Sequence, residues 1–235
     1  MKPTLIAHRC GPDIYPEQSI ASARHALSLG ADYVEMDIQL TSDGELVICH
    51  DLSTARIFGV DKLCSDMTLA EFMALRHCAD RSYPSHSLED VLSTEIKPIL
   101  FHCKISGEPL RKLAQTIAAH GIEKQCVIGV QSVGDVEIIK SVCAQIRVLA
   151  FMPDVKLMDA FLDTHCEYIR LWEEWVTAER VRRIHDANRQ VWIMACRQEE
   201  GGVGYTTEDS MHLWLRMGVD GILVNDVCWA KNIMN

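Results

Sequence analysis

Short runs of apolar residues alternate along the chain with longer stretches in which apolar residues recur every three or four positions. The short runs are typical of buried strands, and the longer stretches are typical of amphipathic helices. This pattern predicts strands at residues 4–7, 33–40, 45–49, 99–104, 125–130, 147–151, 168–171, 190–195 and 221–224. It predicts helices at residues 17–29, 110–120, 134–144, 156–164, 178–188 and 208–217.

The alternation of strands and helices indicates a parallel sheet with crossover helices. If the strand at 45–49 only pairs with the strand before it, eight strand–helix units of about 29 residues share the 235-residue chain, close to the size of a (β/α)8 barrel. A doubly wound open sheet is the main competitor, but the chain has no G-x-G-x-x-G after its first strand and no P-loop. We therefore expect an α/β fold, a single TIM-barrel domain over residues 1–235, with residues 41–87 as an excursion at the barrel mouth.

The charge of the chain excludes several classes of partner. Asp and Glu number 33 against 23 Lys and Arg, a net charge of −10. Nucleic acid and anionic membranes need a basic face, so we expect no nucleic-acid binding and no stable membrane association. The ten cysteines form no C-x-x-C pair, which favours reduced thiols. Because no secretory signal or transmembrane run is visible, we expect a cytoplasmic protein; the oligomeric state stays open.

Ionisable side chains gather where strands of the first half end. Glu35 and Asp37 lie two apart on one strand, so both carboxylates share a face while Val34 and Met36 pack on the other. Two inward carboxylates in a buried barrel repel each other and lose solvation, which makes a metal ion their natural partner. The other such residues are His8 and Arg9 after the first strand, His50 and Asp51 after the third, and His102 and Lys104 on the fourth.

These residue types suit the cleavage of a phosphodiester. Arg and Lys bind phosphate through charge-assisted hydrogen bonds, and a metal held by carboxylates neutralises phosphate oxygens. Two histidines can act as base and acid on opposite sides of the phosphorus atom. Neighbouring barrel strands would deliver all of these groups to one mouth. The remaining histidines lie in helical or loop contexts and are expected to be structural.

The order and spacing of these residues resemble the amino-terminal signature of the glycerophosphodiester phosphodiesterases. The resemblance rests on His8-Arg9, Pro16-Glu17-Gln18-Ser19, residues 30–44 and His50-Asp51, with weaker matches at 68–71, 87–92 and 218–223. The family implies a (β/α)8 barrel with a small insertion after the second strand, matching the excursion at 41–87. It also implies a small-molecule substrate, a glycerophosphodiester, hydrolysed to sn-glycerol 3-phosphate and an alcohol with the help of a divalent cation.

Carried over by position, the resemblance implies a role for each site residue. It assigns His8 and His50 as the acid/base pair, Arg9 and Lys104 as phosphate-binding residues, and Glu35 and Asp37 as metal ligands. Where the family has a third glutamate ligand, this chain has His102, which we expect to be the third ligand. Mg²⁺ or Ca²⁺ is the metal by family resemblance, whereas an imidazole ligand favours Mn²⁺ or another transition metal.

Three further features bear on this resemblance. A Glu-x-Lys sequence occurs at Glu95-Ile96-Lys97, but it precedes the apolar strand, so we interpret it as lying outside the mouth. Near the carboxyl end the family often has Thr-Asp-x-Pro, where this chain has Val224-Asn225-Asp226-Val227. The tryptophan usual in the seventh strand is replaced by Met194, with Trp192 two residues earlier, which leaves the alcohol part of the substrate open.

Two alternatives stand beside a metal-assisted phosphodiesterase. A non-hydrolytic family member would keep the phosphate pocket and have a degenerate metal site at His102. The presence of both His8 and His50 argues against it, because a binding protein needs only the cations. A phospholipid-headgroup phosphodiesterase of similar fold would need a basic membrane-facing patch, which the sequence does not show.

Overall fold

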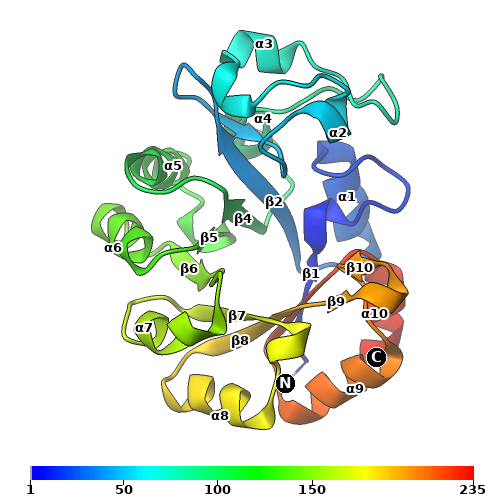
Figure 1. Cartoon of the computed structure of the whole chain (residues 1–235), viewed down its shortest axis with the longest axis vertical. Helices are drawn as coiled ribbons and strands as arrows, with labels where there is room; N and C mark the ends of the chain where they lie inside the picture. The colour runs from blue at the N-terminus through cyan, green and yellow to red at the C-terminus, as the bar shows by residue number, and fades with distance from the viewer. Residues whose placement is uncertain (1) are drawn as a thin grey trace.

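Eight parallel strands close into a barrel in the computed structural model, which describes residues 2–235 (Figure 1). β1 completes the ring because it pairs in parallel with both β2 and β11. This closure excludes the open sheet and confirms the predicted barrel. In order around the ring the strands are β1 (Thr4–Ala7), β2 (Tyr33–Leu40), β4 (Ile99–Cys103), β5 (Cys126–Val130), β6 (Arg147–Ala150), β7 (Tyr168–Trp172), β8 (Gln190–Met194) and β11 (Gly221–Val224).

Helices cover the outside of the barrel (Figure 1). Residues that face the helices and residues that face the barrel axis form separate apolar clusters, as the two-residue period of a strand requires. On β2, Val34 and Met36 belong to the outer cluster, whereas Tyr33 packs inside the barrel. The helices outside are α1 (Ile20–Leu29), α5 (Glu108–Ala119), α6 (Val133–Val142), α7 (Met158–Leu162), α8 (Ala178–Asp186), α9 (Glu208–Met217) and α10 (Val227–Met234).

Residues 41–87 build a layer of their own beside the carboxyl end of β2. β3 (Leu46–Ile48) pairs antiparallel with the last residues of β2, as expected, and Val47 also forms an isolated antiparallel bridge with Ser87. Two short helices, α2 (Ala55–Phe58) and α3 (Leu69–Met73), follow, and α4 (Leu88–Leu92) leads back to the barrel. Phe58 and Phe72 pack edge to face, with ring centroids 5.6 Å apart, in a small apolar cluster separate from the barrel core.

The largest error in the predicted elements is the start of the first helix, which begins at Ile20 rather than at residue 17. Gln18 has a positive φ of 60°, which a helix excludes, and the Ser19 side chain caps the helix by accepting from Ser22 N. The sequence prediction also missed α10 and a small hairpin of β9 (Cys196–Arg197) and β10 (Gly202–Val203). Strands of two residues are too short to show a period.

No helix within residues 2–235 combines the length and the apolar character needed to cross a bilayer. The longest helix described above, α5, has 12 residues, whereas a membrane span needs about 20.

Candidate functional site

The carboxyl ends of β1, β2 and β4 and the turn after β3 bring the predicted residues to one mouth of the barrel. β2 and β4 are paired so that Asp37 lies directly beside His102. The turn after β1 reaches across to both neighbours, because Arg9 N donates to Glu35 Oε2 at 2.8 Å and the Arg9 guanidinium contacts His50. The structure therefore gathers the whole predicted set: His8, Arg9, Glu35, Asp37, His50, His102 and Lys104.

The backbone after β1 adopts a strained conformation that orients the amide and the side chain of Arg9. A single 3-10 turn covers His8–Cys10, and Arg9 and Cys10 have positive φ values of 47° and 69°. Such left-handed residues cost of order 1–3 kcal/mol each and persist only where the surroundings impose them. Here the turn points the Arg9 amide at Glu35 while its side chain reaches His50.

Glu35 and Asp37 are fully buried, and Glu35 Oε1 has no hydrogen-bond partner among the residues that the structure describes. Burial and the neighbouring Asp37 charge raise the pKa of Glu35 to about 8. Burial acts in the same direction on Asp37, but its contacts with His102 and Lys104 prevail and hold the pKa of Asp37 well below its usual range. Glu35 is thus a carboxylate that needs a further cation to stay ionised at neutral pH.

The His102 ring is directed at the two carboxylates and does not turn away. It stacks on Phe151, with ring centroids 3.8 Å apart and planes 9° from parallel. Its Nδ1 lies 3.1 Å from Asp37 Oδ1 and 3.7 Å from Glu35 Oε1. Gly129 permits this stack, because a Cβ at that position would collide with the Phe151 ring.

Glu35, Asp37 and His102 fit a divalent cation. One donor atom from each lies within 4.8 Å of the other two. Lys104 Nζ lies 3.0 Å from Asp37 Oδ1 and 3.1 Å from His102 Nδ1, so its ammonium contacts two of the same atoms. Nδ1 can accept from the Lys104 ammonium only when it carries no proton, which is also the state that a metal ligand requires. A cation held here would therefore compete with Lys104 for these atoms.

His8 is oriented by a residue from the far end of the chain. Its Nδ1 lies 2.8 Å from Asn225 Oδ1, at the end of β11. Asn225 Nδ2 donates to Val203 O at 3.1 Å, which fixes the amide so that its oxygen faces His8. His8 therefore carries its proton on Nδ1 and leaves Nε2 free to accept one. Burial and the Arg9 charge lower the pKa of His8 to about 4, so the ring is neutral at pH 7.

His50 belongs to a closed ring of ionisable side chains that we call the mouth ring. Arg9 Nη2 donates to His50 Nε2 at 2.8 Å, and His50 Nδ1 lies 2.6 Å from Asp51 Oδ1. Arg56 binds Asp51 through Nε at 2.6 Å and Glu17 through Nη2 at 2.6 Å. The ring closes where Arg9 Nη1 donates to Glu17 at 3.3 Å. Asp51 thereby fixes the tautomer of His50 in the same way as Asn225 fixes that of His8.

Sequence reasoning missed the residues that position this site. Gln18 is buried and holds Asp37 from two sides, since its Nε2 donates to Asp37 Oδ2 at 2.6 Å and its Oε1 accepts from Asp37 N at 3.0 Å. Arg56 and Asn225 were likewise given no role. The sequence gives a weak signal for two of these three residues. Gln18 lies inside a block that resembles the family signature, and Asn225 follows a predicted strand.

The exclusion of Glu95-Ile96-Lys97 from the mouth is confirmed. Glu95 is exposed and pairs with Arg24, with Nε and Oε1 2.6 Å apart. Lys97 Nζ donates to carbonyl oxygens of the preceding turn, including Leu92 O at 3.0 Å. Both side chains lie before β4 begins, at the end opposite the site.

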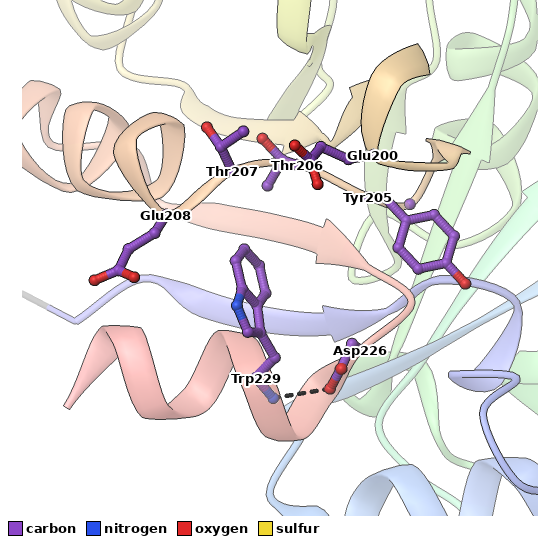
Figure 2. Close-up of a pocket in the computed structure, with 8 residues that line it drawn as sticks. Glu200, Tyr205, Thr206, Thr207, Glu208, Asp226 and Trp229 are labelled. Atoms are coloured by element: carbon purple, nitrogen blue, oxygen red, sulfur yellow. Dashed lines mark hydrogen bonds between the residues drawn. The ribbon is translucent and has the colours of Figure 1, made fainter.

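A hollow outside the barrel mouth is lined by the loop after β10 (Figure 2). Figure 2 shows Tyr205 on this loop and Trp229 on α10, where Trp229 N donates to Asp226 Oδ1 at 2.8 Å. Carboxylates of Glu200, Glu208 and Asp226 line the hollow, so it disfavours a phosphate. The strand before this loop matters for the site, because β10 carries Val203, the partner of Asn225.

Comparison of sequences finds relatives of one kind. Residues 8–157 match the Glycerophosphoryl diester phosphodiesterase family. A glycerophosphodiester phosphodiesterase of Caldanaerobacter subterraneus is 43% identical over 75 residues, which is 32% of this chain and 31% of that protein. Human glycerophosphodiester phosphodiesterase 1 is 41% identical over 78 residues, 33% of this chain and 23% of the human protein. The chain thus aligns with only about a third or less of the length of these two relatives.

Comparison of structures finds the same fold over nearly the whole chain. A glycerophosphodiester phosphodiesterase from Agrobacterium tumefaciens has a TM-score of 0.80 at 17% identity, covering 97% of this chain and 99% of that one. A phosphodiesterase from Oleispira antarctica, in complex with the product sn-glycerol-3-phosphate, has a TM-score of 0.82 at 16% identity, covering 99% and 96%. At these identities the likeness establishes the barrel.

Proposed function

Because the chain belongs to the glycerophosphoryl diester phosphodiesterase family, we propose that it hydrolyses glycerophosphodiesters to sn-glycerol 3-phosphate and an alcohol. One observation carries the proposal: the turn after β1 joins a phosphate-binding group to a cation-binding group. Arg9 donates its backbone amide to Glu35 and its guanidinium to His50. A phosphate bound by the guanidinium would therefore lie between the carboxylates and a histidine. The bound product in the Oleispira relative supports the substrate class.

Glu35, Asp37 and His102 would hold the divalent cation. When bound, the cation supplies positive charge to the phosphate oxygens and so favours attack at phosphorus. Arg9 and Lys104 would bind the remaining oxygens through charged hydrogen bonds. Lys104 would do so after leaving its contacts with Asp37 and His102, and Arg9 after leaving His50.

His8 and His50 would transfer the protons. Both rings are held through Nδ1, by Asn225 and Asp51, so both present Nε2 for proton transfer. One histidine takes the proton of the attacking water or of a neighbouring substrate hydroxyl, and the other protonates the leaving alkoxide. The Arg9 contact occupies His50 Nε2, so phosphate binding by Arg9 would also release His50.

The test of this function is release of glycerol 3-phosphate from a panel of glycerophosphodiesters, with chelator and with single divalent metals added back. We expect turnover that chelator abolishes and that a metal restores. A non-hydrolytic binding protein would bind glycerol 3-phosphate and release none from any substrate. A phospholipid-headgroup phosphodiesterase would prefer the intact phospholipid over its deacylated form.

Changing His102 to glutamate is expected to change the preferred metal. The parent has two carboxylates and one nitrogen donor, which favours Mn²⁺ and neighbouring transition metals, whereas three carboxylates favour Mg²⁺ and Ca²⁺. The metal-activation profiles of parent and His102→Glu measure this. The variant should gain Mg²⁺ or Ca²⁺ activation at the expense of Mn²⁺, and identical profiles would contradict the assignment of His102 as a ligand.

Changing Asn225 to aspartate is expected to move the pH profile of kcat/KM. A carboxylate in place of the amide favours the charged imidazolium and should raise the pKa of His8, now about 4, by roughly 1 to 3. The nearby Arg9 charge opposes that rise and the Asp37 charge assists it. His8 would then be protonated near pH 5–6 in the variant but not in the parent.

The direction of the change identifies the role of His8. If His8 is the base, the variant loses activity near pH 5–6 relative to the parent, because the base must be neutral. If it is the acid, the variant gains activity there. Asn232→Asp, which adds the same charge on the exposed face of α10, should leave the profile unmoved. An unchanged pH profile in Asn225→Asp would show that Asn225 does not position His8.

A further inference from the structure

Arg170 is a buried cation on the inner face of β7 that the proposed chemistry does not use. Its side chain is only 3% exposed. Nη2 donates to Met152 O at 3.1 Å, whereas Nε and Nη1 have no partner among the residues that the structure describes. Within the same residues, no carboxylate is among the groups that shift the pKa of Arg170. A buried guanidinium with two idle donors and no counter-ion is unfavourable unless a ligand supplies the anion.

Aromatic rings cover the Arg170 guanidinium, and its unpartnered Nε and Nη1 are buried beside them. The guanidinium carbon lies 4.2 Å from the Trp172 ring centroid and 5.3 Å from those of Phe151 and Trp175. Stacking of this kind occupies the face of a guanidinium while its N–H groups still point outward in the plane. Burial lowers the pKa of Arg170 to about 9, so the group stays charged at neutral pH.

Arg170 lies across the barrel from the carboxylates and close to the level of the metal ligands. β7 is four strands from β2 in either direction around the ring. Phe151 links the two sides, because its ring stacks on His102 and also lies under the Arg170 guanidinium. A substrate whose phosphate lies at Arg9 and Lys104 would therefore extend its alcohol across the mouth toward Arg170.

We propose that Arg170 forms an anion subsite for the alcohol part of the substrate, which selects glycerophosphodiesters whose alcohol carries a carboxylate or a second phosphate. This inference rests on the proposed function for its substrate scaffold. The proposed subsite should also disfavour alcohols that carry a positive charge. Aromatic faces such as that of Trp172 attract quaternary ammonium groups, but here a guanidinium already occupies them and repels such a group. Choline esters should therefore be poor substrates.

The sharpest test compares glycerophosphoserine with glycerophosphoethanolamine, because these compounds differ by one carboxylate. Their dissociation constants are measured by calorimetry in chelator, and their kcat/KM values with metal. A charged hydrogen bond from Arg170 should favour the serine compound by roughly 10-fold or more in the parent. In Arg170→Met this ratio should fall close to one, and Arg170→Lys should keep part of it.

Arg147→Met is the matched control. Arg147 also sits in the barrel, but at its amino-terminal end, where it donates to the hydroxyls of Tyr33 and Tyr168. Its loss should leave the serine-to-ethanolamine ratio unchanged. If Arg170→Met does not fold, the ratio of dissociation constants in the parent still decides, since equal values overturn the subsite.

The outcomes separate the subsite from the proposed function. Tighter binding of the serine compound without any turnover would support the subsite and overturn the hydrolytic function. Turnover of both compounds with equal dissociation constants would overturn the subsite and leave the function. An equal loss on both compounds in Arg170→Met would place Arg170 on the shared phosphate and also overturn the subsite.

Discussion

Alanine at His8 or at His50 should lower kcat on an unactivated glycerophosphodiester by roughly 100-fold to 10,000-fold, the range that general acid or base groups contribute. Each ring is held through Nδ1 and presents Nε2, so each variant removes one proton-transfer atom. Steady-state rates of glycerol 3-phosphate release measure the loss. Circular dichroism and thermal melting should show that both variants keep the fold.

A substrate with a much better leaving group should partly restore whichever variant lacks the acid, because that substrate needs no proton on departure. His165→Ala is the matched control, since His165 is exposed and pairs with Glu137 at the surface. Near-parental kcat in His8→Ala or His50→Ala would show that this histidine does not transfer a proton in the reaction. Rescue of both variants would show that the two histidines do not divide the acid and base roles.

Glutamine at Glu35 should abolish metal activation and lower kcat/KM by more than about 100-fold, since loss even of outer partners of a metal site costs 10- to 100-fold. The same change should stabilise the metal-free protein. It removes a carboxyl group that is ionised in the unfolded chain but must take up a proton when it is buried beside Asp37, while the amide oxygen can still accept from Arg9 N. A gain of about 1 kcal/mol would raise Tm by roughly 2–4 °C.

These two effects are measured together by activity assays and by melting curves with and without metal. The parent should melt higher with metal, and Glu35→Gln should show no such rise because it no longer binds the ion. Glu95→Gln, at the exposed glutamate of the Glu-Ile-Lys sequence, serves as the control and should behave as the parent. A metal-dependent rise in the Tm of Glu35→Gln would contradict the role of Glu35.

The fold was predictable because its strands are short, apolar and bounded by polar turns. Every barrel strand begins within one residue of its predicted start and ends within one residue of its predicted end. The start of α1 was not predictable, since the conformation of Gln18 is imposed by its hydrogen bonds to Asp37, a contact between distant residues. Periodicity reports local preference, and such contacts override it.

Only the site residues that lie in local sequence motifs could be predicted. His8 and Glu35 lie in recognisable blocks, but their partners are set by closure of the barrel. Asn225 is 217 residues from His8 along the chain, and nothing near Asn225 in the sequence announces the contact. Arg170 gave one signal, a single charge inside the apolar run from Tyr168 to Leu171, and only the structure shows that this charge has no counter-ion.

Barrel closure also determines when activity can arise during synthesis. The residues proposed for chemistry are translated early, and all lie between His8 and Lys104. His8 nevertheless depends on Asn225, and β1 has an unpaired edge until β11 is made. A nascent chain would thus carry the complete chemical set without a working site, and its reactive groups would become competent only when the last strand joins the first.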